Sequence, residues 1–280
     1  MQFRGLMALS LALVMMRPAQ ADYTFASVDF PDVISNWAYG INNTGQIVGS
    51  TFSFGFLLSD DKYTRLDQVP GAYDTFPVGI NDYGEIVGHY RDASGTVHGF
   101  LLSNGEYTSL DVPGATGTVA HRINNAGQIV GNYSDDTRTH GFLLSDGEYT
   151  PIDVPGAVHT YAIGINNAGQ IVGYFMGDVI TSVHGFLLTD CRYTTLDAPG
   201  ADVIYTTCTA INDVGQIIGG YTDIHGVGRA FLLSDGEYTT IDVPPGWNST
   251  AFYGLNNAGQ IVGWYYDRGY IVHGFVATPN

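Results

Sequence analysis

The chain has 280 residues, of which 45% are hydrophobic and 13% aromatic, and its formal net charge is −17. So acidic a surface repels nucleic acid and anionic lipid, which excludes both as expected partners. The apolar content suffices for one large buried core, and no apolar stretch reaches the roughly 20 residues that span a bilayer, so we expect no membrane insertion.

Residues 1–21 have the organisation of a secretory signal peptide. Arg4 provides a positive start, an apolar run extends from Gly5 to Met16, and Ala19-Gln20-Ala21 is a small-residue cleavage site. Because the run is shorter than the roughly 20 residues of a membrane span, a retained anchor is disfavoured. We therefore expect a single domain at 22–280, secreted or periplasmic, monomeric, and with a net charge near −19 once Arg4 and Arg17 are removed.

A nine-residue pattern organises the rest of the chain. It reads I-N-N-A-G-Q-I-V-G at Ile165–Gly173 and returns at Ile41–Gly49, Ile80–Gly88, Ile123–Gly131, Ile211–Gly219 and Leu255–Gly263. The first Asn suits an Asx turn, the first Gly supplies a positive φ, and the Ile-Val pair begins a buried strand. Each copy therefore predicts a β-hairpin turn with a structural role.

The repeat length predicts a β-propeller. Successive first Asn residues are 39, 43, 42, 46 and 44 positions apart, and a period near 40 with four short strands is typical of a propeller blade. The β-branched, aromatic and Gly-punctuated runs disfavour helical repeats. One unit shows four strands, a to d, at Tyr161–Asn166, Gln170–Phe175, His184–Thr189 and Tyr193–Ala198. We predict an all-β fold: a six-bladed β-propeller with four antiparallel strands per blade.

The two ends of the domain predict how the ring closes. Tyr23–Phe30 matches strand d, whereas the chain finishes at Val272–Thr278 with a strand c and no strand d of its own. The N-terminal strand therefore completes the last blade. Cys191 and Cys208 fall about one strand length, roughly 20 Å, apart, beyond the ~7 Å limit of a disulfide, so two free thiols are expected.

The strand order defines two faces of the disc. The turn face carries the a–b turns, such as Asn166–Gly169, and the c–d turns. The variable face carries the b–c loops, such as Met176–Val183, and the d–a crossovers, such as Pro199–Thr206. Loops on a rigid frame can diversify, which favours the variable face as the functional one.

A second motif, H-G-F, follows the nine-residue pattern. It occurs at His98, His140, His184 and His273, while Arg229-Ala230-Phe231 and Phe54-Gly55-Phe56 lack the His. Together, I-N-N-x-G-Q-I-V-G and H-G-F-L-L resemble the bacterial extracellular HAF repeat family over nearly all of residues 22–280. The resemblance implies an exported bacterial repeat protein. The family has no established activity that would assign catalytic residues here.

The triplet histidines begin strand c in different blades, about 10 Å outside the innermost strand. Zinc needs its ligands within about 2.1 Å of one centre, so we expect hydrogen bonding within the blades and no metal. The strand-d aspartates should cap turns, because they are spread around the rim: Asp29, Asp67, Asp111, Asp153, Asp197 and Asp242. No EF-hand loop is present, and we expect no cofactor.

The inner strands break the six-fold symmetry where they begin, on the variable face near the axis. The candidate ligand-binding residues there are Trp37, Tyr39, His121, Tyr161 and Tyr253. Aromatic rings with scattered polar groups suit sugar rings, although aromatic residues could also simply fill the space between blades. The site therefore predicts a saccharide or another small neutral or cationic ligand.

These observations favour a non-catalytic binding or scaffold protein. No nucleophile elbow, zinc motif, P-loop or Rossmann fingerprint is present. The alternative is a propeller hydrolase or lyase acting on a carbohydrate, with His121 or His159 as the acid or base. An interaction hub or a redox role is a third possibility.

Overall fold

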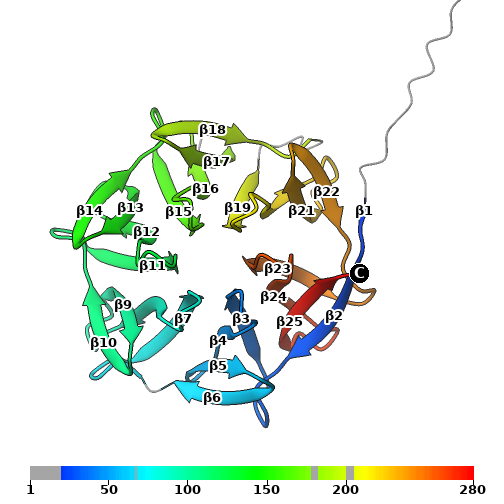
Figure 1. Cartoon of the computed structure of the whole chain (residues 1–280), viewed down its shortest axis with the longest axis horizontal. Coiled ribbons are helices and arrows are strands. Elements are labelled where there is room, and N and C mark those ends of the chain that lie inside the picture. Colours follow the sequence, from blue (N-terminus) through cyan, green and yellow to red (C-terminus); the bar gives the residue numbers. More distant parts are fainter. Residues whose placement is uncertain (1–19, 67, 178–181, 200–204) are drawn as a thin grey trace, which may run out of the picture.

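Six sheets surround a central axis in the computed structural model, which describes residues 20–66, 68–177, 182–199 and 205–280 (Figure 1). The described residues are all β, with no helix. Blades 1 to 3 comprise β3 (Asn36–Ile41), β4 (Ile47–Thr51), β5 (Gly55–Ser59), β6 (Lys62–Leu66); β7 (Asp74–Ile80), β8 (Ile86–Arg91), β9 (Val97–Ser103), β10 (Glu106–Leu110); and β11 (Gly117–Ile123), β12 (Ile129–Ser134), β13 (Thr139–Ser145), β14 (Glu148–Ile152).

The other three blades follow the same order. They comprise β15 (His159–Ile165), β16 (Ile171–Met176), β17 (Val183–Thr189), β18 (Arg192–Leu196); β19 (Thr206–Ile211), β20 (Ile217–Thr222), β21 (Gly228–Ser234), β22 (Glu237–Ile241); and β23 (Asn248–Leu255), β24 (Ile261–Tyr266), β25 (Val272–Pro279), β2 (Tyr23–Val28). Strand a is innermost in each blade, and strands b, c and d follow outward (Figure 1). The predicted six-bladed propeller is confirmed.

The N-terminal strand closes the ring as predicted. Strand β2 pairs antiparallel with β25, so that Phe25 lies opposite Ala277 and Val28 opposite Gly274. Val28 is buried between blades 6 and 1. A further short strand, β1 (Gln20–Ala21), pairs in parallel with β22 and adds a fifth strand to blade 5. Residues 1–19 of the predicted leader lie outside the described residues.

One phenylalanine per blade fills the space between neighbouring blades. All six are at most 1% exposed: Phe56, Phe100, Phe142, Phe186, Phe231 and Phe275. Each ring faces the glycine that ends the nine-residue pattern. A Cβ on Gly173 would lie 3.0 Å from the ring of Phe186 and 1.9 Å from the carbonyl oxygen of Tyr161. Only glycine fits there, which explains why the pattern always ends with it.

The first Asn of each pattern links its own turn to the next blade. The side-chain oxygen of Asn166 accepts from the backbone N–H groups of Ala168 and Gln170, at 3.1 and 3.0 Å. Its amide nitrogen donates to the carbonyl oxygen of Asn212 in the following blade over 3.1 Å. The other five first Asn residues repeat the donation, so that six hydrogen bonds encircle the axis.

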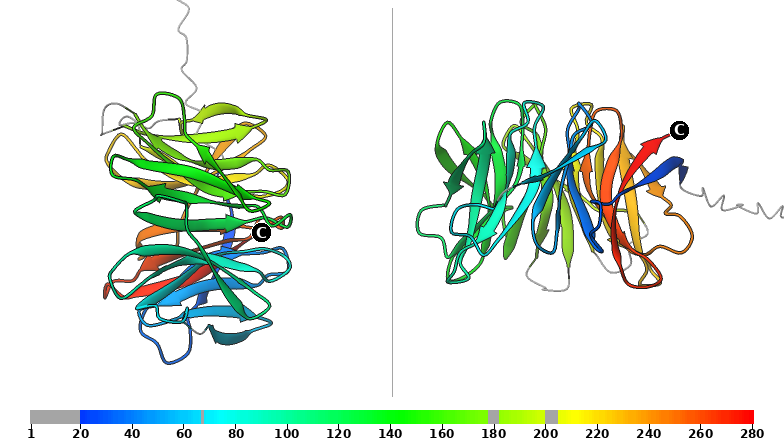
Figure 2. Two further views of the ribbon diagram at one scale, coloured as in Figure 1. Left: turned by 90° about the vertical axis from the view of Figure 1, so that its left-hand side faces the viewer. Right: turned by 90° about the horizontal axis from the view of Figure 1, so that it is seen from below.

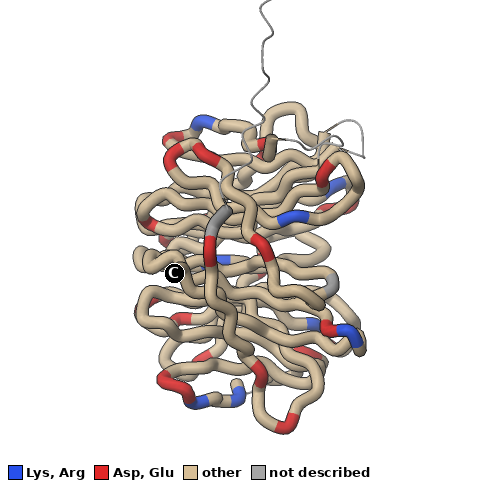
Figure 3. The backbone as a smooth tube through the Cα atoms, turned by 90° about the vertical axis from the view of Figure 1, so that its right-hand side faces the viewer, with Lys and Arg blue, Asp and Glu red and all other residues tan. Residues whose placement is uncertain are grey.

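Seen from the side, the strands run between the two faces of the disc (Figure 2). Acidic residues are spread over the turns and loops, and basic ones are few on the side shown (Figure 3). Neither described cysteine forms a disulfide: Cys191 is exposed and Cys208 buried. No helix capable of crossing a membrane occurs in the part of the chain that the structure describes.

Candidate axial binding site

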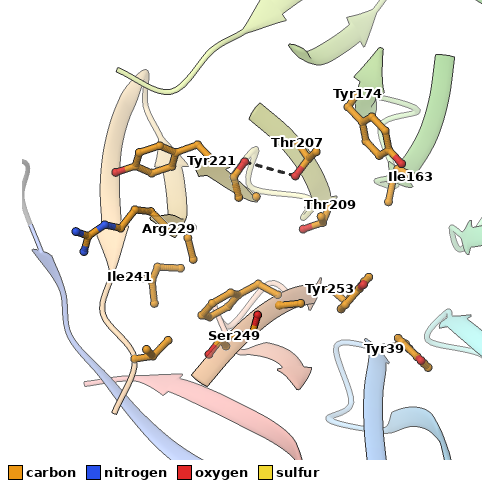
Figure 4. Close-up of a pocket in the computed structure, with 18 of the residues that line it drawn as sticks. Tyr39, Ile163, Tyr174, Thr207, Thr209, Tyr221, Arg229, Ile241, Ser249 and Tyr253 are labelled. Carbon is orange, nitrogen blue, oxygen red and sulfur yellow. Dashed lines mark hydrogen bonds between the residues drawn. The ribbon is translucent and has the colours of Figure 1, made fainter. Parts of the chain in front are cut away.

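A cavity of about 1280 Å³ lies within the ring of inner strands and continues between blades 5 and 6 (Figure 4). Its wall combines aromatic rings with neutral polar groups. Tyr39 and Tyr253 meet edge to face with ring centroids 5.4 Å apart, and Phe76 stacks on His89 at 5.1 Å. Burial raises the pKa of Tyr39 to about 12, so its phenol stays protonated at neutral pH.

Two histidines in this wall are uncharged at neutral pH. Burial lowers the pKa of His121 to about 4, although its Nε2 bonds the amide oxygen of Asn132 over 2.6 Å. Burial likewise lowers the pKa of His89 to about 4. The Nδ1 of His89 is buried and has no hydrogen-bond partner among the described residues. The wall therefore presents neutral imidazoles, which can donate or accept hydrogen bonds.

Every inner strand has a β-bulge near its end. The bulged residue is the one that precedes Gly40-Ile41 in blade 1 and the corresponding pair of residues in each other blade. In blade 1, for example, the register shifts between Ala38 and Gly40, which leaves Tyr39 outside the ladder. Equivalent shifts occur in the other five inner strands. A bulge residue is left without its ladder partner, so its carbonyl group needs another donor.

Arg122 provides that donor for four blades. Its guanidinium bonds the carbonyl oxygens of Val78 and His121 at 2.7 and 2.9 Å. It also bonds those of Tyr39, at 2.9 Å, and Tyr253. Burial lowers the pKa of Arg122 to about 10, so it remains charged at neutral pH. Because Arg122 lines both the axial cavity and the small well on the turn face, it separates the two.

The structure brings together three of the five predicted ligand-binding residues. Tyr39, His121 and Tyr253 line the cavity. Trp37 packs edge to face against Phe52, at 4.8 Å, and Tyr161 stacks on Tyr174, at 4.6 Å. Neither Trp37 nor Tyr161 is among the described residues that line the cavity.

The two histidines named for the enzymatic alternative do not converge. The Nδ1 of His159 accepts a hydrogen bond from the backbone N–H of Thr139 over 3.0 Å. His159 is not among the described cavity-lining residues, whereas His121 is. Asp242 is the one carboxylate among those lining residues, so no carboxylate pair lies there for acid–base work. The guanidinium of Arg122 donates to carbonyl oxygens and to no carboxylate among the described residues, so its positive charge in the cavity wall disfavours a cationic ligand.

The triplet histidines have the structural role that was expected, with an unexpected partner. Each lies within hydrogen-bonding distance of the strand-d aspartate of its own blade: His98–Asp111, His140–Asp153, His184–Asp197 and His273–Asp29, at 2.9 to 3.0 Å. The expectation that these aspartates cap turns is therefore wrong for these four; Asp67 lies outside the described residues. No group of three potential metal ligands occurs in the described part of the chain.

Arg122 is a site residue that sequence reasoning missed. The signal for Arg122 was present in the repeat, because its column contains Gly in four blades, Ala in one and Arg in one: Gly40, Gly79, Arg122, Gly164, Ala210 and Gly254. Space is tight where the residue is Gly, since a Cβ on Gly40 would lie 2.7 Å from the carbonyl oxygen of Val78. An arginine in such a column indicates a specific role.

Comparison with solved structures supports the propeller architecture. AofleA from Arthrobotrys oligospora superposes with a TM-score of 0.56 at 12% identity, covering 92% of this chain and 86% of that one. A gluconolactonase from Xanthomonas campestris gives 0.55 at 10% identity, covering 95% and 99%. The Aleuria aurantia lectin, solved with a fucosyl-N-acetylglucosamine disaccharide, gives 0.54 at 10% identity, covering 87% and 91%. Identities this low show the fold alone.

No protein-family model and no curated protein matches the sequence. The resemblance to the HAF repeat family therefore stays a prediction. The chain is established as an all-β, six-bladed propeller whose structural neighbours include a lectin and a gluconolactonase.

Proposed function

We propose that this protein binds a neutral saccharide in the axial cavity, as an exported, non-catalytic binding module. The observation that carries the proposal is the wall of the cavity, where the rings of Tyr39 and Tyr253 stand beside the uncharged imidazoles of His89 and His121. Sugar rings pack their apolar faces on aromatic side chains and hydrogen-bond around their edges. The Aleuria aurantia lectin among the structural neighbours, solved with a disaccharide, supports this choice of ligand class.

The proposal includes removal of residues 1–21 on export. Cleavage after Ala21 would remove β1, which pairs with β22. Blade 5 would then have four strands, as the other blades do. Strand β2 begins at Tyr23, so the closure of the ring would survive cleavage.

A glycan array probed with residues 22–280, followed by calorimetry on the strongest hit, tests the proposal. Replacing Tyr39, His121 or Tyr253 by Ala should weaken binding by about 5- to 150-fold, corresponding to about 1–3 kcal/mol per lost contact. Trp37→Ala is the matched control, because Trp37 belongs to an inner strand but packs on Phe52 outside the cavity. Binding that is lost in the control, or kept in all three cavity variants, would reject the axial site.

A further inference from the structure

The cavity has a branch that leaves the axis between blades 5 and 6. Its lining residues come from both sides of that gap, with Tyr221, Arg229 and Ile241 on blade 5 and Ser249 and Phe252 on blade 6 (Figure 4). A pocket for a drug-sized ligand usually has about 300–1,000 Å³, and this cavity has about 1280 Å³. The site therefore has room for more than one sugar ring.

Two glycines of blade 5 create the branch. Gly220 occupies a strand-b column that holds larger side chains in the other blades: Ser50, His89, Asn132, Tyr174 and Trp264. Gly228 begins strand c, where four other blades have Val or Thr: Val97, Thr139, Val183 and Val272. Blade 5 thus lacks both side chains that would fill this part of an inter-blade space.

The space beside these glycines is open. A Cβ on Gly228 would meet nothing within 4 Å. A Cβ on Gly220 would meet only the carbonyl oxygen of Arg229, at 3.6 Å, and the hydroxyl of Thr207, at 3.7 Å, which are ordinary contacts. By contrast, a Cβ on the neighbouring Gly219 would lie 2.0 Å from the carbonyl oxygen of Thr207. Close packing therefore demands glycine at 219 but not at 220 or 228.

The opposite wall is also irregular at this place. Strand β23 has a second register shift, between Asn248 and Thr250, beside the bulge that every inner strand has. Ser249, which lies in that shift, has a φ of +44°, a value that few residues other than glycine adopt. Strained backbone is often retained where it serves a site. Both walls of the branch thus depart from the repeat.

The lining of the branch suits a neutral, hydroxyl-rich chain. The residues that line it include Thr207, Thr222 and Ser249, which have hydroxyl groups, and the aromatic Tyr221 and Phe252. The charge of Arg229 is balanced by Asp223, whose Oδ2 accepts from its Nε over 3.0 Å. We infer that the protein binds a linear neutral oligosaccharide, with a terminal ring at the axis and the following rings between blades 5 and 6. This inference rests on the proposed saccharide site.

Calorimetry with four series of neutral homo-oligosaccharides, of glucose, N-acetylglucosamine, mannose and galactose, tests the inference with oligomers of one to six rings. At least one series should bind at least tenfold more tightly at three or four rings than at one. Gly220→Tyr, which installs the residue of blade 4, should abolish this gain and leave the affinity for the single ring unchanged. Gly220→Ala is the control, because its methyl group makes only ordinary contacts.

Gly228→Val, which installs the residue of three other blades, provides a second test should Gly220→Tyr fail to fold. Affinity independent of chain length, or a length dependence kept in both variants, would overturn the inference and leave the axial saccharide site standing. If no oligomer of the four series binds, the inference is rejected whatever the array shows. If no array glycan binds either, the proposed function is rejected with it.

Discussion

The side-chain amide of Asn256 donates a hydrogen bond to the backbone oxygen of Asn42 over 3.2 Å, across 214 residues of sequence. This bond completes the circle of six Asn residues that joins the last blade to the first. A second circle lies outside it, in which the side chains of residues such as Asn43 accept from the backbone N–H of the preceding blade's Asn257. The repeated Asn-Asn and Asn-Asp pairs thus fasten neighbouring blades as well as forming turns.

We expect Asn256→Ala to lower the free energy of unfolding by about 2–4 kcal/mol, because it removes the buried bond to the carbonyl oxygen of Asn42 and the two bonds that hold its own turn. The carbonyl oxygen of Asn42 then keeps only the N–H of Gly45 as a donor. Asn257→Ala, in the exposed outer circle, should cost less than about 1 kcal/mol. Denaturant unfolding of the two variants measures the difference. Equal losses of unfolding free energy in the two variants would show that the inner circle stabilises the ring no more than the outer one.

Deleting residues 22–31 should destroy the cooperativity of unfolding. The deletion removes β2, leaves the edge of β25 unpaired, and exposes the cluster into which Val28 packs. Calorimetry should show a broad transition at lower temperature in place of one sharp peak. If the truncated protein melts like the full domain, the ring does not depend on this closure.

Arg122→Met should cost several kcal/mol of stability, since four carbonyl oxygens lose their donor in a buried place. Arg122→Lys should recover only part of the loss, because an ammonium group cannot match the geometry of the guanidinium fork. Denaturant midpoints of the three proteins give the comparison. A Lys variant as stable as wild type would show that charge alone matters there.

His89→Phe should reduce the loss of unfolding free energy that the protein undergoes as the pH falls below about 6.5. The folded pKa of His89 is about 4, below the unfolded value of about 6.5. The unfolded state therefore binds a proton first, and wild-type stability falls as the pH drops from about 6.5 to 4, by up to about 2–3 kcal/mol from this residue. Above pH 7 the variant should match or exceed wild type, because an unpartnered buried Nδ1 is removed.

Urea unfolding of wild type and His89→Phe at several pH values between 4.5 and 8 measures this effect. Parallel curves for the two proteins would contradict the depressed pKa. The same variant should weaken saccharide binding if His89 hydrogen-bonds the ligand. Higher stability with lower affinity would mark His89 as a residue retained for function.

The pair of His184 and Asp197 offers a clean double-mutant cycle. The His184 ring lies 3.0 Å from the carboxylate and stacks on Phe175, with 5.2 Å between ring centroids. Single changes to Ala and the double change should give a coupling of about 0.5–1 kcal/mol. A control cycle of His184 with Asp111, in another blade, should give a coupling near zero. Similar values in both cycles would mean that the contact contributes nothing.

The sequence predicted the fold because the residues that fix it are repeated. Each first Asn and each pattern-ending Gly recurs six times at a nearly constant spacing. Chance agreement is thereby excluded, and the order of the strands in each blade follows. The His–Asp pairing was missed although both residues recur 13 positions apart, as in His184 and Asp197. Residue types alone did not show whether the carboxylate turns toward the backbone or toward the ring.

The site was only partly predictable, because it depends on where single side chains find partners. Tyr39, His121 and Tyr253 are bulge residues of inner strands, and their shared column brings them to the axis. Trp37 packs instead against Phe52, which belongs to a variable loop outside the repeated pattern. The branch between blades 5 and 6 results from the lack of side chains at Gly220 and Gly228. The identity of a glycine does not show whether the space beside it is open, as at Gly220, or filled, as at Gly219.

The pairing of β2 with β25 sets an order of events for a newly made chain. A ribosome produces Tyr23–Val28 more than 240 residues before Val272–Pro279, so β2 waits without its partner while the blades between them are made. Contacts that span nearly the whole chain form slowly, and an unpaired strand is prone to aggregate in the meantime. Four of the six residues of this strand are apolar, namely Tyr23, Phe25, Ala26 and Val28, so the hazard lasts until blade 6 is made and covers them.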